Sequence, residues 1–111
     1  MASDLSFVEH VCDQIRDAGE VSFKKMFGEY AIYCDGKGVA LVCENRLFVK
    51  PTAAGRLHLG DVDEASPYPG AKPHFLIGDL LENRQSISNL IQITASELPA
   101  PAPKRLKKTK E

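Results

Sequence analysis

The sequence predicts an α+β domain in two layers, in which an antiparallel β-meander packs against an N-terminal and a C-terminal helix. Between residues 30 and 50, three short apolar runs are separated by residues 35–38 and 44–46, which contain Asp, Gly or Asn. Short β-rich runs joined by tight turns of this kind are typical of a meander. Residues 3–18 and 83–98 instead repeat apolar side chains at helical spacing, so a helix is expected on either side.

The first helix is expected from Ser3 to Ala18. Ser3 is placed to cap its N-terminus, and Gly19 to end it in the left-handed conformation. The next residues, 21–27, have the pattern of a strand. The apolar stripe of the helix is Leu5, Val8, Cys12 and Ile15, and the inward-facing residues of the strand are Val21, Phe23 and Met26.

The meander has two faces, because side chains alternate along a strand. A four-residue turn that pairs Cys34 with Val39 and a three-residue turn at 44–46 assign each residue to one face. A second turn of two residues would flip Leu47 and Val49, and this alternative remains open. The expected core face holds Tyr30, Ile32, Cys34, Val39, Leu41, Cys43, Leu47 and Val49. The opposite face holds Ala31, Tyr33, Ala40, Val42, Phe48 and Lys50.

Residues 52–72 have little periodicity and several Gly and Pro residues, so a long loop is expected there. Within it, residues 56–59 have the pattern of a short helical turn or strand, and residues 68–71 suit a type II turn. Residues 73–77 read as a strand that residues 79–82 extend.

The second helix is expected from Asn83 to Leu98. Asn83 is a suitable N-cap, and Pro99 ends the helix. The domain therefore spans residues 1–98, and residues 99–111 form a Pro-rich basic tail with no core-forming pattern, expected to be extended or disordered.

Charge is segregated along the chain. Residues 104–111 hold five basic side chains and one acidic, whereas the remaining residues hold nine basic and fourteen acidic. Duplex binding usually requires a basic domain surface, so we expect no direct DNA binding by the domain. The tail is an electrostatic candidate for contact with nucleic acid or an acidic partner. Its basic residues are Lys104, Arg105, Lys107, Lys108 and Lys110.

The sequence offers no catalytic or cofactor-binding motif. The three cysteines, an odd number in a chain without a signal-peptide pattern, favour free thiols and a cytoplasmic location. Neither the spacing of metal ligands nor a phosphate-binding glycine loop is found. Apolar runs fall well short of the roughly 20 residues of a membrane span. We expect no enzyme activity, no cofactor, no metal and no membrane segment.

The candidate interaction residues form two groups. Lys25, Glu29 and Tyr30 would border a surface groove. Tyr33, Phe48 and Lys50 would belong to an apolar patch on the second face of the sheet, and such a patch usually marks an interface. A two-fold homodimer is the expected result. In the competing arrangement, the loop 52–72 folds over this face, anchored by Leu57, Leu59 and Tyr68.

Four segments together resemble the N-terminal domain of the TfoX/Sxy family. They are Lys25-Met26-Phe27-Gly28, the hairpin entry Tyr33 to Gly36, Ala40-Leu41-Val42 and Leu47-Phe48-Val49-Lys50, and the resemblance covers roughly residues 15 to 98. It implies an antiparallel sheet packed by helices, and it brings no catalytic residues.

Named members of this family are bacterial regulators of natural competence that work with a cyclic-AMP receptor protein. Those members carry a second domain similar to helix–hairpin–helix DNA-binding modules, and this chain is expected to lack it. The resemblance therefore implies a protein-interaction module, an accessory of transcription or competence regulation with an unknown partner. The alternative is a small-ligand-binding protein or enzyme that uses the loop 52–72 over the sheet. A pocket lined by Tyr30, Tyr33, Lys50 and His74 would favour that alternative.

Overall fold

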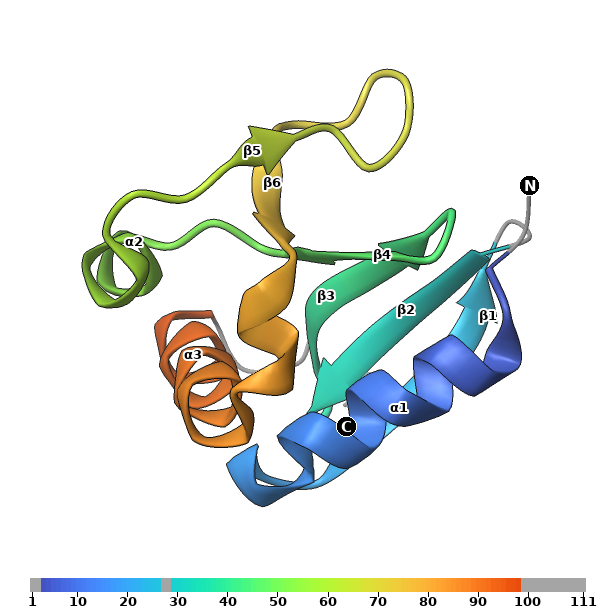
Figure 1. Cartoon of the computed structure of the whole chain (residues 1–111), viewed down its shortest axis with the longest axis horizontal. Helices are drawn as coiled ribbons and strands as arrows, with labels where there is room; N and C mark the ends of the chain where they lie inside the picture. The colour runs from blue at the N-terminus through green and yellow to red at the C-terminus, as the bar shows by residue number, and fades with distance from the viewer. Residues whose placement is uncertain (1–2, 27–28, 99–111) are drawn as a thin grey trace, which may run out of the picture.

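The computed structural model describes residues 3–26 and 29–98, and within them it confirms the predicted α+β class. Six strands form one antiparallel sheet in the order β1-β2-β3-β4-β6-β5 (Figure 1). The strands are β1 (Val21–Met26), β2 (Glu29–Cys34), β3 (Lys37–Cys43), β4 (Arg46–Val49), β5 (Glu64–Ala65) and β6 (His74–Ile77). The helices are α1 (Leu5–Ile15), α2 (Ala53–Leu59) and α3 (Arg84–Glu97), with 3₁₀ turns η1 (Arg16–Ala18) and η2 (Asp79–Glu82).

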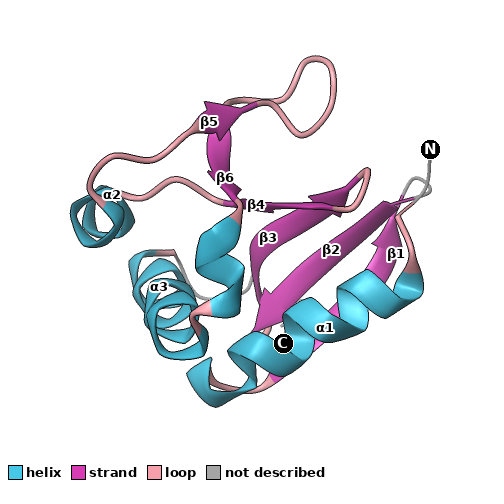
Figure 2. Ribbon diagram, in the orientation of Figure 1, coloured by secondary structure: helices cyan, strands magenta, loops and turns pink. Residues whose placement is uncertain are grey.

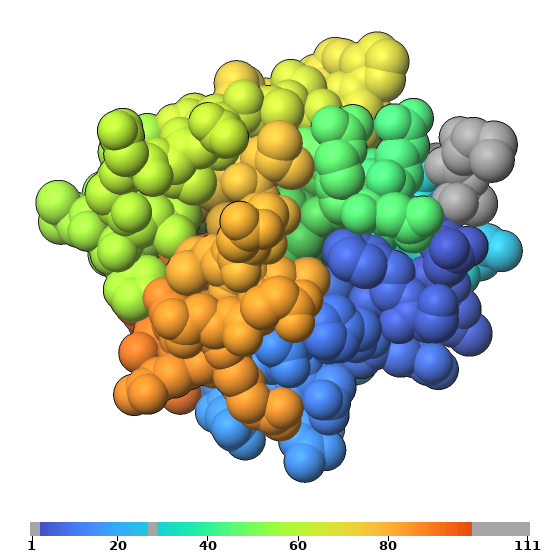
Figure 3. Space-filling view, viewed as in Figure 1, coloured from blue at the N-terminus to red at the C-terminus, as the bar shows by residue number. Residues whose placement is uncertain are grey.

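One face of the sheet is covered by helices. Helices α1 and α3 lie side by side on it, and the main core fills the space between them and the strands (Figure 2). In the space-filling view this side is a closed surface, blue for α1 and orange around the start of α3 (Figure 3). Fully buried core residues include Val11 and Ile15 from α1, Ile87 and Leu90 from α3, and Ile32, Val42, Leu47, Val49 and Phe75 from the sheet.

The register of the meander differs from the predicted one. Asp35 and Gly36 alone form the first turn, so that Cys34 pairs with Lys37, and Glu44 and Asn45 alone form the second, so that Cys43 pairs with Arg46. A bulge between Ile32 and Tyr33 then shifts the pairing by one residue.

As a result, several faces were assigned wrongly. Ala40 and Val42 lie on the helix-covered face with Leu47 and Val49, whereas Leu41 lies on the opposite face beside Phe48. The physical reason lies in the turns. Asp35, Glu44 and Asn45 adopt positive φ angles of 53°, 52° and 57°, which permits two-residue hairpin turns.

Other local predictions fared unevenly. The Asn83 side chain accepts a hydrogen bond from the Ser86 amide at 3.1 Å, as an N-cap should. Ser3 does not cap α1, because Asp4 occupies the N-cap position. Gly19 has φ 158° and ψ −156°, which is not the expected left-handed conformation.

The expected loop at 52–72 contains the whole of α2 and the strand β5. Thr52 caps α2 by accepting a hydrogen bond from the Gly55 amide at 2.9 Å. Residues 79–82 form η2 instead of extending β6. The predicted tail at 99–111 lies outside the described residues.

Candidate functional site

The face of the sheet opposite α1 and α3 carries two neighbouring hollows, and we call it the open face. Alternation along the strands assigns to it Met26, Ala31, Tyr33, Leu41, Cys43, Phe48, Lys50 and Leu76. The first hollow has a volume of about 370 Å³ and the second about 440 Å³. Met26, Leu41 and Tyr68 line both, so the two hollows form one groove along β3.

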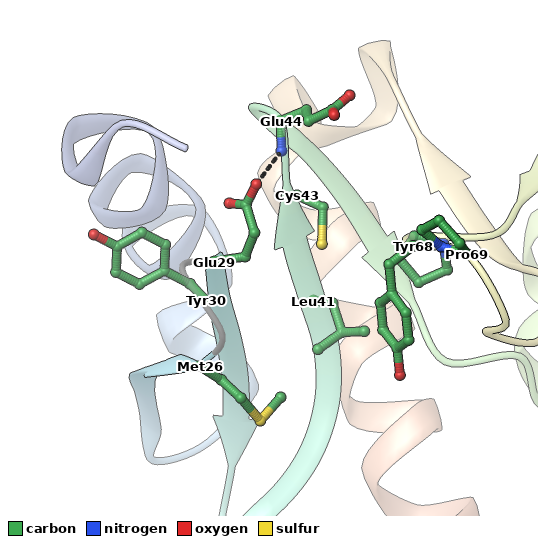
Figure 4. Close-up of a pocket in the computed structure, with 9 residues that line it drawn as sticks. Met26, Glu29, Tyr30, Leu41, Cys43, Glu44, Tyr68 and Pro69 are labelled. Atoms are coloured by element: carbon green, nitrogen blue, oxygen red, sulfur yellow. Dashed lines mark hydrogen bonds between the residues drawn. The ribbon is translucent and has the colours of Figure 1, made fainter. Parts of the chain in front are cut away.

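The first hollow is mainly apolar. Leu41 and Cys43 of β3 form its floor, with Met26 at one side and Tyr68 at the other (Figure 4). Pro67 and Pro69 complete the wall on the Tyr68 side. Tyr68 is 55% exposed, so an apolar ring stands over the sheet with one side in water. An aromatic ring with a polar end in this position is suited to contact a partner.

The chain around Tyr68 is held at both ends. The Ala71 amide donates to the Tyr68 carbonyl at 3.1 Å and Gly70 has φ 89°, as the predicted type II turn requires. The Ser66 hydroxyl donates to the Ala71 carbonyl at 2.9 Å, and β5 pairs with β6. The loop therefore forms a fixed wall of the groove.

The second hollow is basic. The residues that line it include Lys50, Lys72 and His74, and none of its lining residues in the described chain is acidic. A Cβ added at Gly38 would lie 3.6 Å from both Lys50 Nζ and the Tyr33 ring, so both groups lie over the glycine. Lys24 Nζ lies 5.8 Å from the centroid of the same ring. The ammonium groups of Lys24, on β1, and of Lys50, directly after β4, thus both lie in the neighbourhood of one aromatic side chain.

The far end of the groove is acidic, and hydrogen bonds hold its carboxylate in place. Glu29 accepts hydrogen bonds from the Ser3 hydroxyl at 2.7 Å, the Ser3 amide at 2.9 Å and the Glu44 amide at 3.1 Å. Burial alone would raise the pKa of Glu29, but these bonds outweigh it and hold the pKa below its usual value. The Asn45 amide also donates to the Ser3 hydroxyl, at 2.9 Å. The start of α1 is thereby tied to the β3–β4 turn.

The three cysteines are free thiols whose surroundings keep them protonated. Burial, helped by Glu9, raises the pKa of Cys12 to about 11. Burial also raises the pKa of Cys34 and of Cys43. Because the thiolate is the reactive form, the Cys43 thiol in the first hollow is a poor nucleophile. Within residues 3–26 and 29–98, no group of His, Cys, Asp and Glu side chains is arranged to hold a metal ion.

The structure separates the predicted interaction residues. Tyr33 and Lys50 lie together at the second hollow. Glu29 and Tyr30 both line the first hollow, whereas Lys25, which pairs with Tyr30 across β1 and β2, lines neither hollow. Two of the three residues expected to border a groove, Glu29 and Tyr30, therefore do line one, and Lys25 does not.

Phe48 is on the open face as predicted, but only 1% of it is exposed. It does not form the exposed patch that was expected. The loop anchors were also partly wrong, since Leu57 is 86% exposed and Leu59 packs on the main core, whereas Tyr68 does stand at the open face. Lys104, Arg105, Lys107, Lys108 and Lys110 lie outside the described residues.

Sequence reasoning missed Met26 and Leu41 as groove residues and Lys24 as the neighbour of Tyr33. Leu41 was missed because the predicted register placed it on the core face, and Met26 was missed because it was expected to face the core. The Asn45 in the second turn was the available signal, because Asn readily takes the positive φ of a two-residue hairpin turn. No sequence pattern pointed to Lys72 as a groove residue, because its place beside Lys50 in the second hollow depends on how the loop folds.

Comparison with known proteins gives two matches. The model of a family described as the TfoX N-terminal domain matches residues 13–98. An uncharacterised 12.7 kDa protein from the trpE 5′ region of Spirochaeta aurantia is 41% identical over 107 residues, which cover 96% of this chain and 93% of the relative. None of the helices in the described residues is long and apolar enough to cross a membrane.

Proposed function

The chain belongs to the TfoX N-terminal domain family, and from this premise we propose that it is a protein-interaction module that binds its partner on the open face. The observation that carries the proposal is the groove itself. It joins an apolar hollow to a basic one, and its lining residue Tyr68 is 55% exposed. Exposed aromatic and apolar side chains beside charged groups are typical of binding surfaces.

We propose that the module is not an enzyme. The raised pKa values of Cys12, Cys34 and Cys43 argue against a cysteine nucleophile. His58 Nε2 lies 3.3 Å from the Ser86 hydroxyl, but it also lies 3.2 Å from the Ser86 carbonyl, and both side chains are on the surface. A serine nucleophile needs a base that a third group orients, and no such group is among the recorded hydrogen-bond partners of His58 in the described residues.

We propose an accessory role in transcription or competence regulation, in the cytoplasm, through a protein partner and not through DNA. Membership of the family supports the regulatory role, and the excess of acidic over basic side chains outside residues 104–111 disfavours DNA contact. A homodimer through the open face is the competing use of the same surface. Because Phe48 is buried, its contact surface would be formed by Leu41, Tyr68 and Tyr33. A mobility-shift assay at physiological salt should detect no sequence-specific DNA complex, and a specific complex would overturn the non-DNA role.

A capture experiment tests the module. Wild type, Tyr68→Glu and Leu57→Glu are immobilised and exposed to lysate of the native cell, and the retained proteins are identified by mass spectrometry. Leu57, 86% exposed on α2, is the matched control for an apolar-to-acidic change away from the groove. Wild type and Leu57→Glu should retain a protein that Tyr68→Glu loses. Equal retention by all three variants would contradict the proposal.

A small-ligand-binding function is the second candidate, and one observation favours it. Tyr33, Lys50 and His74 line the second hollow together, under a wall supplied by the loop before β6. Native mass spectrometry of protein purified from its own cell would decide, because a resident ligand adds a defined mass that Lys50→Glu should remove. An unmodified mass for the wild type would dismiss this candidate.

A further inference from the structure

We infer that the open face binds an extended, acidic peptide segment of a partner protein. One bulky apolar side chain would enter the first hollow, and carboxylates would lie over the second. This inference rests on the proposed function and adds the chemistry of the partner to it.

The dimensions of the groove favour an extended chain. Its basic end lies above Gly38 and its acidic end at Glu44, both on or next to β3. At about 3.3 Å per residue, six steps along a strand span roughly 20 Å, the reach of about six residues of extended peptide. That length exceeds a small metabolite and fits a peptide segment.

A second copy of this chain fits the groove less well. If two copies met through their open faces, the hollows of one copy would face the hollows of the other. Two facing hollows leave voids, which protein interfaces avoid. The wall at Tyr68 would also meet its counterpart before the floors at Leu41 came close. A narrow convex element, such as a peptide chain, fills the space between the walls.

The apolar hollow supplies an anchor site. Leu41, Met26 and the Tyr68 ring surround a volume of about 370 Å³, large enough for one Leu, Met or Phe side chain. In most interfaces a few residues contribute most of the binding free energy, and they lie in pockets near the centre of the interface.

The charges determine which segment binds. Within residues 3–26 and 29–98, no carboxylate oxygen lies within 4.0 Å of the ammonium groups of Lys24, Lys50 or Lys72. These ammonium groups can therefore bind carboxylates of the partner without first breaking an ion pair within the domain. At the other end, Glu29 and Glu44 would repel them, so that the acidic residues of the segment gather at one end.

A peptide selection tests the inference. A phage-displayed library of random peptides is selected on the full wild-type chain, and affinities of the selected peptides are measured by fluorescence anisotropy. The key variants are Lys24→Glu and Lys50→Glu. Lys25→Glu is the matched control, because it makes the same charge change at the neighbouring exposed residue of β1, on the other side of the sheet. Circular dichroism verifies that each variant is folded.

The selected peptides should combine Asp or Glu with one bulky apolar residue. Their affinity should fall about tenfold or more in Lys24→Glu and Lys50→Glu and change less than about twofold in Lys25→Glu. Uncharged or basic peptides that lose binding in Tyr68→Glu alone would overturn this inference and leave the proposed function standing. If the selection yields no peptide, or if Tyr68→Glu weakens none of the selected peptides, both the inference and the proposed function are wrong. Sedimentation provides the remaining check. If the wild type is a dimer and Tyr68→Glu is a monomer, the groove binds a second copy of the chain, and the inference of a peptide ligand is wrong.

Discussion

Leu41 and Phe48 lie opposite each other on β3 and β4, on the same face of the sheet, and differ in their exposure. Phe48 is 1% exposed, whereas Leu41 is half-buried and lines both hollows. The guanidinium of Arg46 lies 5.5 Å from the centroid of the Phe48 ring and helps to cover it. Phe48 is thus buried beside Leu41 on the open face, whereas Leu41 forms the half-exposed floor of the groove.

Replacing these two residues should have unequal effects on stability. Phe48→Ala should lower the free energy of unfolding by about 3–5 kcal/mol, because it leaves a cavity at a buried position of the open face. Leu41→Ala should cost roughly half as much or less, because part of the side chain is already in water. Urea unfolding measures both. Equal losses would mean that Leu41 is buried as deeply as Phe48, which would contradict the register.

The contact between Ser3 and Glu29 should make stability depend on pH. The folded-state pKa of Glu29 lies below its ordinary value of 4.5, so the unfolded chain binds more protons in the interval between the two. The stabilisation is therefore fully present above about pH 4.5 and is lost as the pH falls through the folded pKa. Urea unfolding of wild type should show this acid loss, and Glu29→Gln should show less of it. Parallel pH curves for the two proteins would exclude the contact.

The hydrogen bond between Ser88 and Gln14 should join the two helices of the core. The buried Ser88 hydroxyl donates to the Gln14 carbonyl at 3.0 Å. Ser88→Ala should cost about 1–3 kcal/mol, because a buried carbonyl loses its partner. Ser96→Ala is the matched control on the same helix. Its hydroxyl donates to Ile93 on the exposed side, so it should stay within about 0.5 kcal/mol of wild type. A neutral Ser88→Ala would refute this role.

Removal of residues 100–111 should leave the melting temperature unchanged within error. Leu106 is the one large apolar side chain among them, so their composition offers little that could pack on the domain. Differential scanning calorimetry is sensitive enough, because about 1 kcal/mol shifts a domain of this size by roughly 4–8 °C. A drop of several degrees would indicate that the tail docks on the body.

The fold class was predictable because it depends on periodicity. The two terminal helices, the three strands of the meander and the N-cap at Asn83 follow from local patterns that the structure confirms. Which side chains of β3 face the helices was harder to predict. One bulge at Ile32 and Tyr33 and two shorter turns suffice to exchange Leu41 with Val42, and each such choice is worth little free energy on its own.

The groove was even less accessible from sequence. Tyr33 and Lys50 were found because both lie in or next to the meander, but their common position over Gly38 depends on the bulge. Lys72 and Tyr68 reach the same face only through the fold of a loop anchored by β5. Local patterns predict such a loop's turn, as they did at residues 68–71, but not the surface on which it lies.

The most direct test of the central claim is site-specific photo-crosslinking in the native cell. A photoreactive phenylalanine derivative replaces Tyr68 in one strain and Leu57 in another, and the adducts are compared by gel electrophoresis and mass spectrometry. Both positions are exposed, at 55% and 86%, but only Tyr68 lines the groove. The account predicts a discrete protein adduct from position 68 that position 57 does not give. No adduct from position 68, or the same adducts from both positions, would contradict it.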